Sequence, residues 1–145
     1  MRQKHETSVS ILTVGEFEPD RPLLQEITGR FGWRLFEAPD RYRALQTLAQ
    51  HPIQVVLAES HMPQWDWKKV LRDLRRMPHP PQLIVASRTA DDRLWAEVLN
   101  IGGYDVLPKP LERDEVERVV AAAVRHYQLP ASAVSGVSAP AASVA

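Results

Sequence analysis

The chain alternates short apolar runs with amphipathic stretches five times, and this alternation limits its fold more than any other feature. The apolar runs lie at residues 9–14, 33–36, 53–58, 83–86 and 104–107. Runs of this length, each followed by a segment with helical periodicity, are typical of βα units. Such units build a parallel sheet with helices on both faces, joined by right-handed crossovers. We therefore expect an α/β fold with five parallel strands.

Two segments indicate their structural role most clearly. The run Ile53–Ala58 is interrupted by a single polar residue, which is typical of a strand buried on both faces of a parallel sheet. The last amphipathic stretch has apolar residues at spacings of three and four, which predicts a helix. Its predicted core face consists of Val116, Val119, Val120, Ala123 and Val124.

The two helices expected after the first two strands have recognisable ends. Asp20 can cap the first helix, Pro22 is tolerated in its first turn, and Gly32 ends it. Asp40 can cap the second helix, and His51-Pro52 closes it. One side of that second helix carries Tyr42, Leu45 and Leu48.

The third and fourth helices follow the central strands. The third is expected at about residues 66–75 and carries basic side chains that we interpret as a solvated face, namely Lys68, Lys69, Arg72, Arg75 and Arg76. The fourth is expected at residues 89–101, with Leu94, Val98 and Trp95 directed inward. Trp65 and Trp67 are expected to pack in the core or against loops, whereas an exposed tryptophan would be a candidate interface anchor.

Composition excludes several functional classes. The chain of 145 residues has 18 basic and 18 acidic side chains, and this balance gives no reason to expect a nucleic-acid or membrane partner. Cysteine is absent, which excludes disulfides, thiolate metal sites and cysteine nucleophiles. The five histidines lack a metal-ligand spacing. The sequence shows neither a signal peptide nor an apolar segment of membrane-spanning length, so a cytoplasmic location is expected.

The composition changes near the end of the last predicted helix. From Leu129 onward the sequence consists of Ala, Ser, Val, Pro and Gly without charge or useful period. Such a segment does not form a packed core. We expect residues 1–127 to form the α/β domain and residues 128–145 to form a flexible Ala/Ser/Pro-rich tail or linker.

Polar residues follow the predicted strands, and they should meet at one edge of the sheet. In open parallel sheets, ligands bind outside the carboxyl ends of the strands. The residues found there are Gly15, Glu16, Glu59, Ser87 and Lys109. Carboxylates, a hydroxyl and a lysine on such an edge are the groups that a phosphoryl-acceptor site uses, with acidic residues holding a divalent cation.

These segments resemble the response-regulator receiver family. The segment 57–63, Leu-Ala-Glu-Ser-His-Met-Pro, is similar to the family's phosphoacceptor region, with Glu59 at the acceptor position. The segment 102–110, Gly-Gly-Tyr-Asp-Val-Leu-Pro-Lys-Pro, is similar to its lysine-proline signature. The resemblance implies a flavodoxin-like (βα)5 three-layer sandwich with strand order 2-1-3-4-5. It also implies that Ser87 is the switch hydroxyl, that Lys109 contacts phosphate, and that a cis bond precedes Pro110.

The sequence departs from the family pattern at three site positions. Gly15 stands where one of two acidic metal-site residues is implied, leaving Glu16 of that pair. Glu59 replaces the acceptor aspartate and places its carboxylate about 1.5 Å further into the site. Val106 occupies the position of the switch aromatic residue. Since Mg²⁺ demands near-octahedral geometry, we predict no metal site on these residues.

The replacement of the acceptor aspartate leaves several readings open. Glu59 could pair with Lys109 and Ser87 as a partial mimic of a phosphoryl group, or it could be a harmless substitution in an inactive domain. Ser87 could also be a simple turn residue. We predict a pseudo-receiver that acts by protein–protein interaction and is not an enzyme. The alternative is a phosphorylation-competent, Mg²⁺-dependent receiver.

The resemblance also implies which kinds of partner the domain meets. These are a sensor kinase, an output domain, or a second copy bound through the face of the fourth and fifth predicted helices. No direct contact with nucleic acid or with a membrane is expected from this domain.

Overall fold

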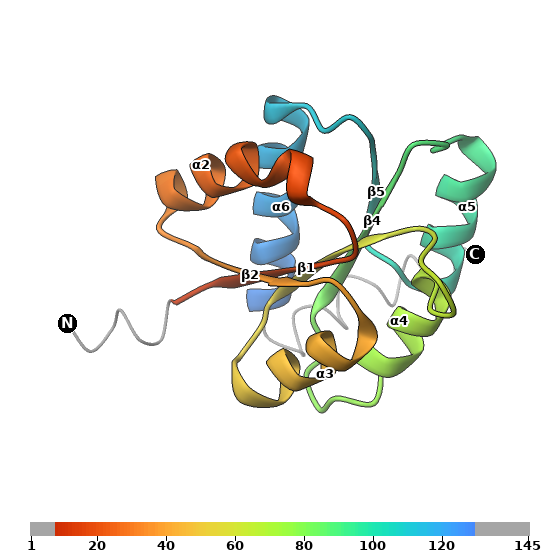
Figure 1. Ribbon diagram of the computed structural model, residues 1–145, viewed down its shortest axis with the longest axis horizontal. Coiled ribbons are helices and arrows are strands. Elements are labelled where there is room, and N and C mark those ends of the chain that lie inside the picture. Colours follow the sequence, from red (N-terminus) through yellow and green to blue (C-terminus); the bar gives the residue numbers. More distant parts are fainter. Residues whose placement is uncertain (1–7, 130–145) are drawn as a thin grey trace.

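The computed structural model describes residues 8–129, which form a five-stranded parallel sheet covered by helices on both faces (Figure 1). The strands are β1 (Ser10–Val14), β2 (Arg34–Ala38), β3 (Val55–Glu59), β4 (Gln82–Ser87) and β5 (Asp105–Pro108). They pair in the order β2-β1-β3-β4-β5. The predicted fold class and strand order are therefore confirmed.

Five α-helices and one short 3-10 helix connect these strands within the described residues. They are η1 (Glu18–Asp20), α2 (Arg21–Phe31), α3 (Arg41–Gln50), α4 (Trp67–Leu74), α5 (Asp92–Ile101) and α6 (Arg113–Gln128). The fourth and fifth predicted helices thus correspond to α5 and α6. The predicted boundary at residue 127 lies near the end of α6, and residues 130–145 of the predicted tail lie outside the described residues.

The three layers follow from the alternation of side chains along each strand. Leu12 and Val14 of β1 belong to a core that contains side chains of α3, α4 and α5. Ile11 lies on the opposite face, in a core shared with α2 and α6. Figure 1 shows α2 on one side of the sheet and α3 with α4 on the other. Because successive strand residues point to opposite faces, two apolar layers form around one sheet.

The periodicity of the last helix is confirmed in full. All five residues of its predicted core face are buried, and they belong to the core on the α2 side of the sheet. Burying a valine side chain contributes about 1.5 kcal/mol or more. Because α6 lies against β3, β4 and β5, its apolar face helps to fix the strands whose carboxyl ends carry the polar residues described below.

Aspartates begin three of the helices. The carboxylate of Asp40 accepts a hydrogen bond from the Arg43 amide at 2.9 Å, as predicted for the start of α3. Asp66 accepts from the Lys69 amide at 3.1 Å at the start of α4. Each bond satisfies one of the free amides of a first helical turn.

The fourth predicted helix begins later than its sequence suggests. Asp91 caps α5 by accepting from the Leu94 amide at 2.9 Å, so the helix starts at Asp92 rather than Thr89. The Thr89 amide instead donates to the Ser87 hydroxyl at 3.1 Å. This local bond holds residues 87–89 in a turn, so the helix begins only after it.

The second strand also begins one residue later than predicted. The Trp33 amide donates to the Thr28 carbonyl at 2.8 Å, which closes the end of α2. Trp33 therefore belongs to the helix terminus, and β2 starts at Arg34.

Two aromatic residues lie on different helix faces from those predicted. Tyr42 is 72% exposed, whereas Ala44 is buried. Two residues correspond to about 200° around a helix, so these side chains point in opposite directions. Trp95 is 45% exposed, and its indole N–H donates to Asp105 at 2.8 Å.

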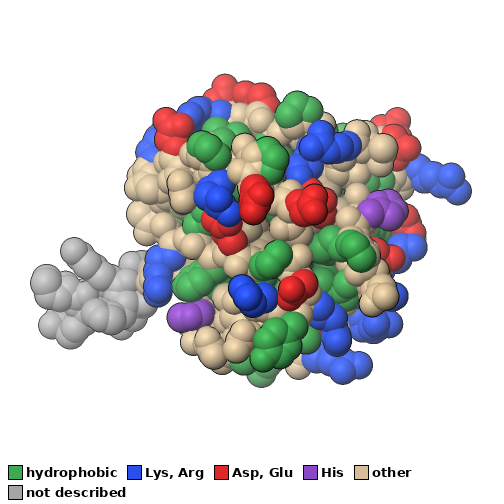
Figure 2. Space-filling model, in the orientation of Figure 1, with side chains coloured by type: hydrophobic (Ala, Val, Ile, Leu, Met, Phe, Trp, Pro, Cys, Tyr) green, Lys and Arg blue, Asp and Glu red, His purple; other side chains and the backbone are tan. Residues whose placement is uncertain are grey.

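The remaining expectations for large and basic side chains are confirmed. Trp65 and Trp67 are buried in the core, and the five basic residues on and after α4 are exposed. Figure 2 shows acidic and basic side chains interspersed over the visible face, in keeping with the balanced charge. Among the helices formed by residues 8–129, none combines the length and apolar character that a bilayer crossing requires.

Candidate functional site

The carboxyl ends of the strands meet at one edge of the sheet because the strand register aligns them. Glu59 pairs with Ala86, and Ser87 pairs with Pro108. Backbone hydrogen bonds continue past the strands, and the Lys109 amide donates to the Ser87 carbonyl at 2.9 Å. The structure therefore brings Gly15, Glu16, Glu59, Ser87 and Lys109 to a common edge, as the sequence predicts.

The centre of this edge is an ion pair between Lys109 and Glu59. The Lys109 ammonium donates to the Glu59 carboxylate. The lysine side chain is 4% exposed and the glutamate side chain 21% exposed. A buried ammonium group is stable only when negative groups surround it, so this lysine depends on its partners. The peptide bond between Lys109 and Pro110 is cis, as the resemblance implies.

Three further groups contact the Lys109 ammonium. It donates to the backbone carbonyl of Glu16 at 3.1 Å. One carboxylate oxygen of Asp20 lies 3.5 Å from it. The Phe17 ring centroid lies 4.3 Å away, within the range of a cation–π interaction. All of these groups come from the segment between β1 and α2, so the lysine joins both ends of the domain's sequence.

Asp20 is a site residue that sequence reasoning assigned to another role. It precedes α2 as predicted, but it has helical backbone angles and its carboxylate approaches Lys109 instead of capping the helix. Its side chain is 14% exposed. The turn η1 directs Asp20 toward this edge of the sheet. The Asp20 amide donates to the Phe17 carbonyl at 3.0 Å. An aspartate that caps a helix and an aspartate that belongs to the site have the same local sequence. The sequence therefore contains no feature that distinguishes these two roles for Asp20.

Gly15 provides the space that the Glu59 side chain occupies. Its φ is +111°, a value that residues with side chains rarely adopt. A Cβ atom at this position would lie 2.8 Å from Cγ of Glu59 and 3.2 Å from the Met62 sulfur. An acidic residue at position 15 is therefore incompatible with both the backbone and the neighbouring side chains.

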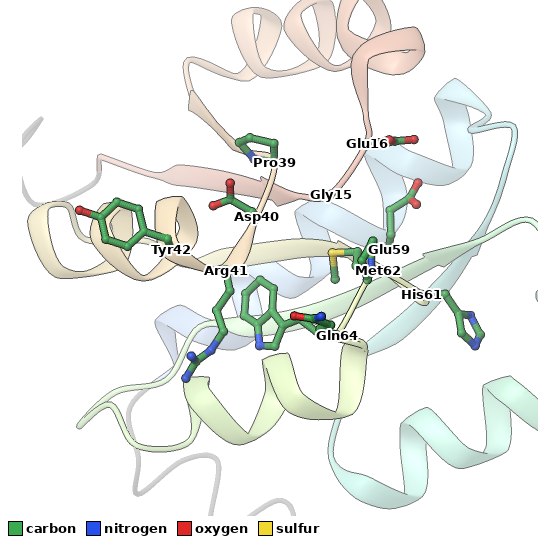
Figure 3. A pocket seen from close by; sticks show the side chains of 12 residues that line it. Gly15, Glu16, Pro39, Asp40, Arg41, Tyr42, Glu59, His61, Met62 and Gln64 are labelled. Carbon is green, nitrogen blue, oxygen red and sulfur yellow. The ribbon is translucent and has the colours of Figure 1, made fainter.

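Glu16 contributes to the site mainly through its backbone. Its carbonyl accepts from Lys109, whereas the residue as a whole is exposed. Figure 3 shows Glu16 and Glu59 at the same end of a pocket. The Glu16 carboxylate is thus near the site, but solvent screens it.

Ser87 belongs to a separate network of hydroxyl groups, formed by two buried serines and the exposed Thr89. The Ser60 hydroxyl donates to Ser87 at 3.0 Å, and the Thr89 hydroxyl lies 3.2 Å from Ser87. Nδ1 of His61 lies 3.2 Å from the Ser60 hydroxyl. Both serines are buried. Ser60 and Thr89 were not predicted as site residues, although each lies next to or near a predicted one.

Val106 lies in the core beneath this edge of the sheet and does not belong to the site. The side chain is 2% exposed and packs in the core on the α3–α5 side of the sheet. A valine in this position has no polar atom to hydrogen-bond with Ser87 or with a ligand. Its place in the structure is that of a core residue.

Two cavities adjoin the ion pair. A cavity of about 190 Å³ lies between Glu59, Ser60, Ser87 and Lys109. A larger cavity of about 620 Å³ opens beside it, between the loops that follow β1, β2 and β3 (Figure 3). Tyr42, Met62 and Trp65 are among the residues that line the larger cavity.

The wall of the larger cavity is fixed by Asp73, a partly buried residue of α4. Asp73 accepts a hydrogen bond from the Trp65 indole at 3.1 Å and pairs with Arg41 at 3.1 Å. Burial alone would raise the pKa of Asp73, but the hydrogen bonds from Arg41 and Trp65 and the positive charges of Arg41 and Arg72 outweigh it and lower the pKa. Asp73 is therefore held in its charged form, which ties α3 to α4.

The residues of the rim do not fit the Mg²⁺ site that the resemblance implies. Gly15 has no side chain to offer, and a larger residue cannot replace it. The Glu59 carboxylate is engaged by the Lys109 ammonium. Within residues 8–129, no group of three His, Cys, Asp or Glu side chains is arranged to hold a metal ion.

Comparisons with known protein sequences identify the family to which the chain is similar. A family model described as the response regulator receiver domain matches residues 4–121. The uncharacterized transcriptional regulatory protein YrkP of Bacillus subtilis is 30% identical over 120 residues, which cover 82% of this chain and 51% of that protein. The transcriptional regulatory protein ZraR of Klebsiella oxytoca is 28% identical over 128 residues, which cover 88% of this chain and 29% of that protein. The chain spans only about half or less of the length of these curated relatives.

Solved structures show the same fold. The signal receiver domain of an HD domain-containing protein from Pseudomonas fluorescens Pf-5 matches with a TM-score of 0.72 and 27% identity, covering 83% of this chain and 97% of that one. A Francisella response regulator receiver domain matches with a TM-score of 0.67 and 23% identity, covering 83% of this chain and all of that one. The second likeness bears on the fold alone.

Proposed function

This chain belongs to the response regulator receiver family, and from that premise we propose that it is a pseudo-receiver that signals without phosphorylation of Glu59. The observation that carries the proposal is the ion pair between Glu59 and the buried ammonium of Lys109. The carboxylate at the acceptor position is already held by the group that would otherwise bind a phosphoryl oxygen. The domain thereby keeps one contact of the phosphorylated state permanently.

The mimicry is limited to this one contact. A phosphoryl group carries a charge of about −1.5 to −2 and three acceptor oxygens, whereas a glutamate offers one charge and two oxygens. The Ser87 hydroxyl, which we expected as a second partner, bonds with Ser60 and Thr89. Val106 is buried and has no aromatic ring to reorient. We therefore propose that the pairing of Lys109 with Glu59 defines the active form. The conformations of Ser87 and of residue 106 do not define it.

Intact-mass measurement tests whether the acceptor position is silent. The domain is incubated with a small phosphodonor such as acetyl phosphate and Mg²⁺, and its mass is recorded over time. We expect no gain of a phosphoryl group, because Glu59 is engaged and the acid at position 15 is missing. A gain of one phosphoryl group that disappears in Glu59→Gln would instead establish the phosphorylation-competent, Mg²⁺-dependent receiver.

A second experiment separates the mimic from a neutral substitution. Glu59→Gln keeps the size of the side chain and removes its charge, which weakens the hold on Lys109. If Glu59 maintains the active form, this variant changes self-association or partner binding. If both remain as in the wild type, the glutamate is a harmless substitution and the mimic is refuted.

We propose that the output is protein contact through α5. Trp95 and Leu99 lie one turn apart on the same face of this helix and are 45% and 53% exposed. A charged side chain borders this pair, since the indole N–H of Trp95 donates to Asp105 at 2.8 Å. Contiguous exposed apolar side chains with a polar rim are typical of interaction sites.

A second copy of the chain is the occupant that we propose for this face. A twofold interface places the same patch on both subunits, so it must complement itself. The exposed apolar side chains of Trp95 and Leu99 meet that requirement, because an apolar patch complements a copy of itself. Sedimentation velocity over a range of concentrations tests it: we expect a dimer that Trp95→Ala with Leu99→Ala dissociates. A wild type that stays monomeric at all concentrations would refute self-association and leave a different protein as the partner.

The remaining features of the chain are consistent with a role inside a larger assembly. The two curated relatives reported above are named as transcriptional regulators and are longer than this chain. We propose that residues 1–127 are the receiver unit and that residues 128–145 act as a linker or tail. Contact with a sensor kinase or an output domain would be made by protein surfaces of the receiver unit and not by binding nucleic acid.

A further inference from the structure

We propose that the ammonium group of Lys109 is the resident cation of this site and that Asp20 is its third anchor, so that a divalent metal ion is replaced by a side chain of the protein. This inference rests on the proposed function in one respect, namely that Glu59 acts as a partner of Lys109 and not as an acceptor. It adds a role for Asp20 and predicts how the site responds to metal ions.

The Lys109 ammonium makes two hydrogen bonds and one further ion pair. An ammonium group has three N–H donors. Three oxygens surround it: the Glu59 carboxylate, the Glu16 carbonyl at 3.1 Å and the Asp20 carboxylate at 3.5 Å. The Phe17 ring covers the group at 4.3 Å. The ammonium is thus enclosed as a bound cation would be, and its side chain is only 4% exposed.

Asp20 supplies the second negative charge that position 15 cannot provide. A side chain at residue 15 would collide with Glu59. Asp20 reaches the same region from η1, where Pro19 lies in the first turn. Its side chain is 14% exposed, and the sequence position would suit a helix cap that it does not form. The approach to Lys109 explains why this carboxylate is turned away from the helix.

The charges of this cluster disfavour an additional divalent ion. Glu59 and Asp20 carry two negative charges, and Lys109 already neutralises one of them. A metal ion bound to the same oxygens would stand beside the buried ammonium, and two cations in a partly buried site repel each other strongly. Removing the ammonium while keeping the carboxylates should therefore open a place for the metal.

The first test measures metal binding directly in the full chain. Mn²⁺ is titrated into the wild type, Lys109→Met and the double variant Asp20→Asn/Lys109→Met, and bound ion is measured by electron paramagnetic resonance. We expect no saturable site in the wild type, one site in Lys109→Met, and a loss of at least tenfold in affinity in the double variant. A stoichiometric site in the wild type, or a folded Lys109→Met that gains none, would overturn the inference.

The second test does not depend on the folding of Lys109→Met. An amine-reactive acylating reagent labels exposed lysines, and peptide mass spectrometry gives the rate at each lysine. We expect Lys109 to react at least tenfold more slowly than the exposed Lys68, and Asp20→Asn to accelerate labelling at Lys109. The matched control is Glu18→Gln, in the same turn but outside the Lys109 contacts described above. Equal rates for Lys109 and Lys68, or no effect of Asp20→Asn, would refute the role of Asp20.

These outcomes remain separate from those of the phosphodonor experiment. A phosphorylated Glu59 would refute the pseudo-receiver proposal, whatever the lysine-labelling rates are. A saturable Mn²⁺ site in a wild type that acquires no phosphoryl group would refute only the replacement of the metal by Lys109.

Discussion

Gly15 and Glu59 share a space that holds only one side chain. A Cβ atom on Gly15 would lie 2.8 Å from Cγ of Glu59 and 3.1 Å from its Cβ, well inside the optimal separation of two carbon atoms. Gly15 also has a φ of +111°. The missing acid and the altered acceptor are therefore parts of one local arrangement. This arrangement leaves the Glu59 carboxylate to Lys109.

Substitution of Gly15 tests this shared space. We expect Gly15→Ala to reduce the free energy of unfolding by about 1–3 kcal/mol, because of backbone strain together with the overlap with Glu59. In a Glu59→Ala background, Cγ is absent and the overlap is smaller. The loss should then decrease by at least about 0.5 kcal/mol, the lower end of coupling between residues in contact. Urea unfolding of the four proteins in this double-mutant cycle measures the difference.

Gly29 in α2 provides the control for this cycle. A Cβ atom there would meet no other atom within 4 Å, and the residue is helical. Gly29→Ala should therefore leave stability unchanged or raise it by up to about 1 kcal/mol. Strictly additive losses for Gly15→Ala and Glu59→Ala would show that the two residues do not compete for space.

The fold was predictable because its signals are local and repeated. The strand β3 (Val55–Glu59) was expected from the apolar run 53–58, and the core face of α6 was expected from the helical period of residues 116–124. The common edge follows from topology, since parallel strands with right-handed crossovers end on the same side. Glu59, Ser87 and Lys109 could thus be brought together without any knowledge of their contacts.

The partners within the site were not predictable for a different reason. The approach of Asp20 to Lys109 depends on the turn η1, and the sequence before α2 is equally suited to a helix cap. The bond between Ser60 and Ser87 joins the residue after β3 to the last residue of β4, and the sequence does not specify the register of these two strands. Such contacts depend on distances of a few ångströms between segments that are remote in the chain.

The predicted helix faces of two aromatic residues were wrong, because a periodicity argument treats aromatic side chains as apolar. Tyr42 and Trp95 both carry a polar group that favours exposure of one end. The indole N–H of Trp95 donates to Asp105, the first residue of β5. The exposure of Trp95 is what makes α5 a candidate contact surface.

The hydroxyl network around Ser87 predicts a local change in backbone protection. Ser87→Ala removes the acceptor for the Thr89 amide and one of the two partners of the Ser60 hydroxyl, which keeps only its contact with Nδ1 of His61. We expect a loss of about 1–3 kcal/mol in the free energy of unfolding. Hydrogen exchange of the Thr89 amide should become faster. Ser60→Ala is the control, since it keeps the bond between Thr89 and Ser87 and should leave that amide protected.

The lowered pKa of Asp73 predicts a specific pH dependence. A carboxyl group whose pKa is lower in the folded than in the unfolded state stabilises the fold above its unfolded pKa of about 3.9. This contribution is lost as the pH falls through the folded pKa. We expect Asp73→Asn to be less stable than the wild type at pH 6 and the difference to shrink below about pH 4. Urea unfolding at several pH values measures it.

Arg41 provides the matched variant for this pH experiment. Its guanidinium donates the hydrogen bond that lowers the pKa of Asp73 most strongly. Arg41→Met should therefore also reduce the pH-dependent part of the stability, although Trp65 still donates to Asp73. A difference between wild type and Asp73→Asn that stays constant from pH 6 to pH 3 would contradict the assignment.

Glu59→Asp tests which departure keeps the acceptor position silent. The shorter side chain restores the acceptor residue that the family resemblance implies, but Gly15 still offers no carboxylate. The variant also brings its carboxylate back by about one carbon–carbon bond, so the pairing with Lys109 weakens. We expect no gain of a phosphoryl group with acetyl phosphate and Mg²⁺, measured as intact mass beside a Glu59→Gln control. If Glu59→Asp is phosphorylated while the wild type is not, the length of residue 59 alone silences the site, and the missing acid at position 15 does not matter.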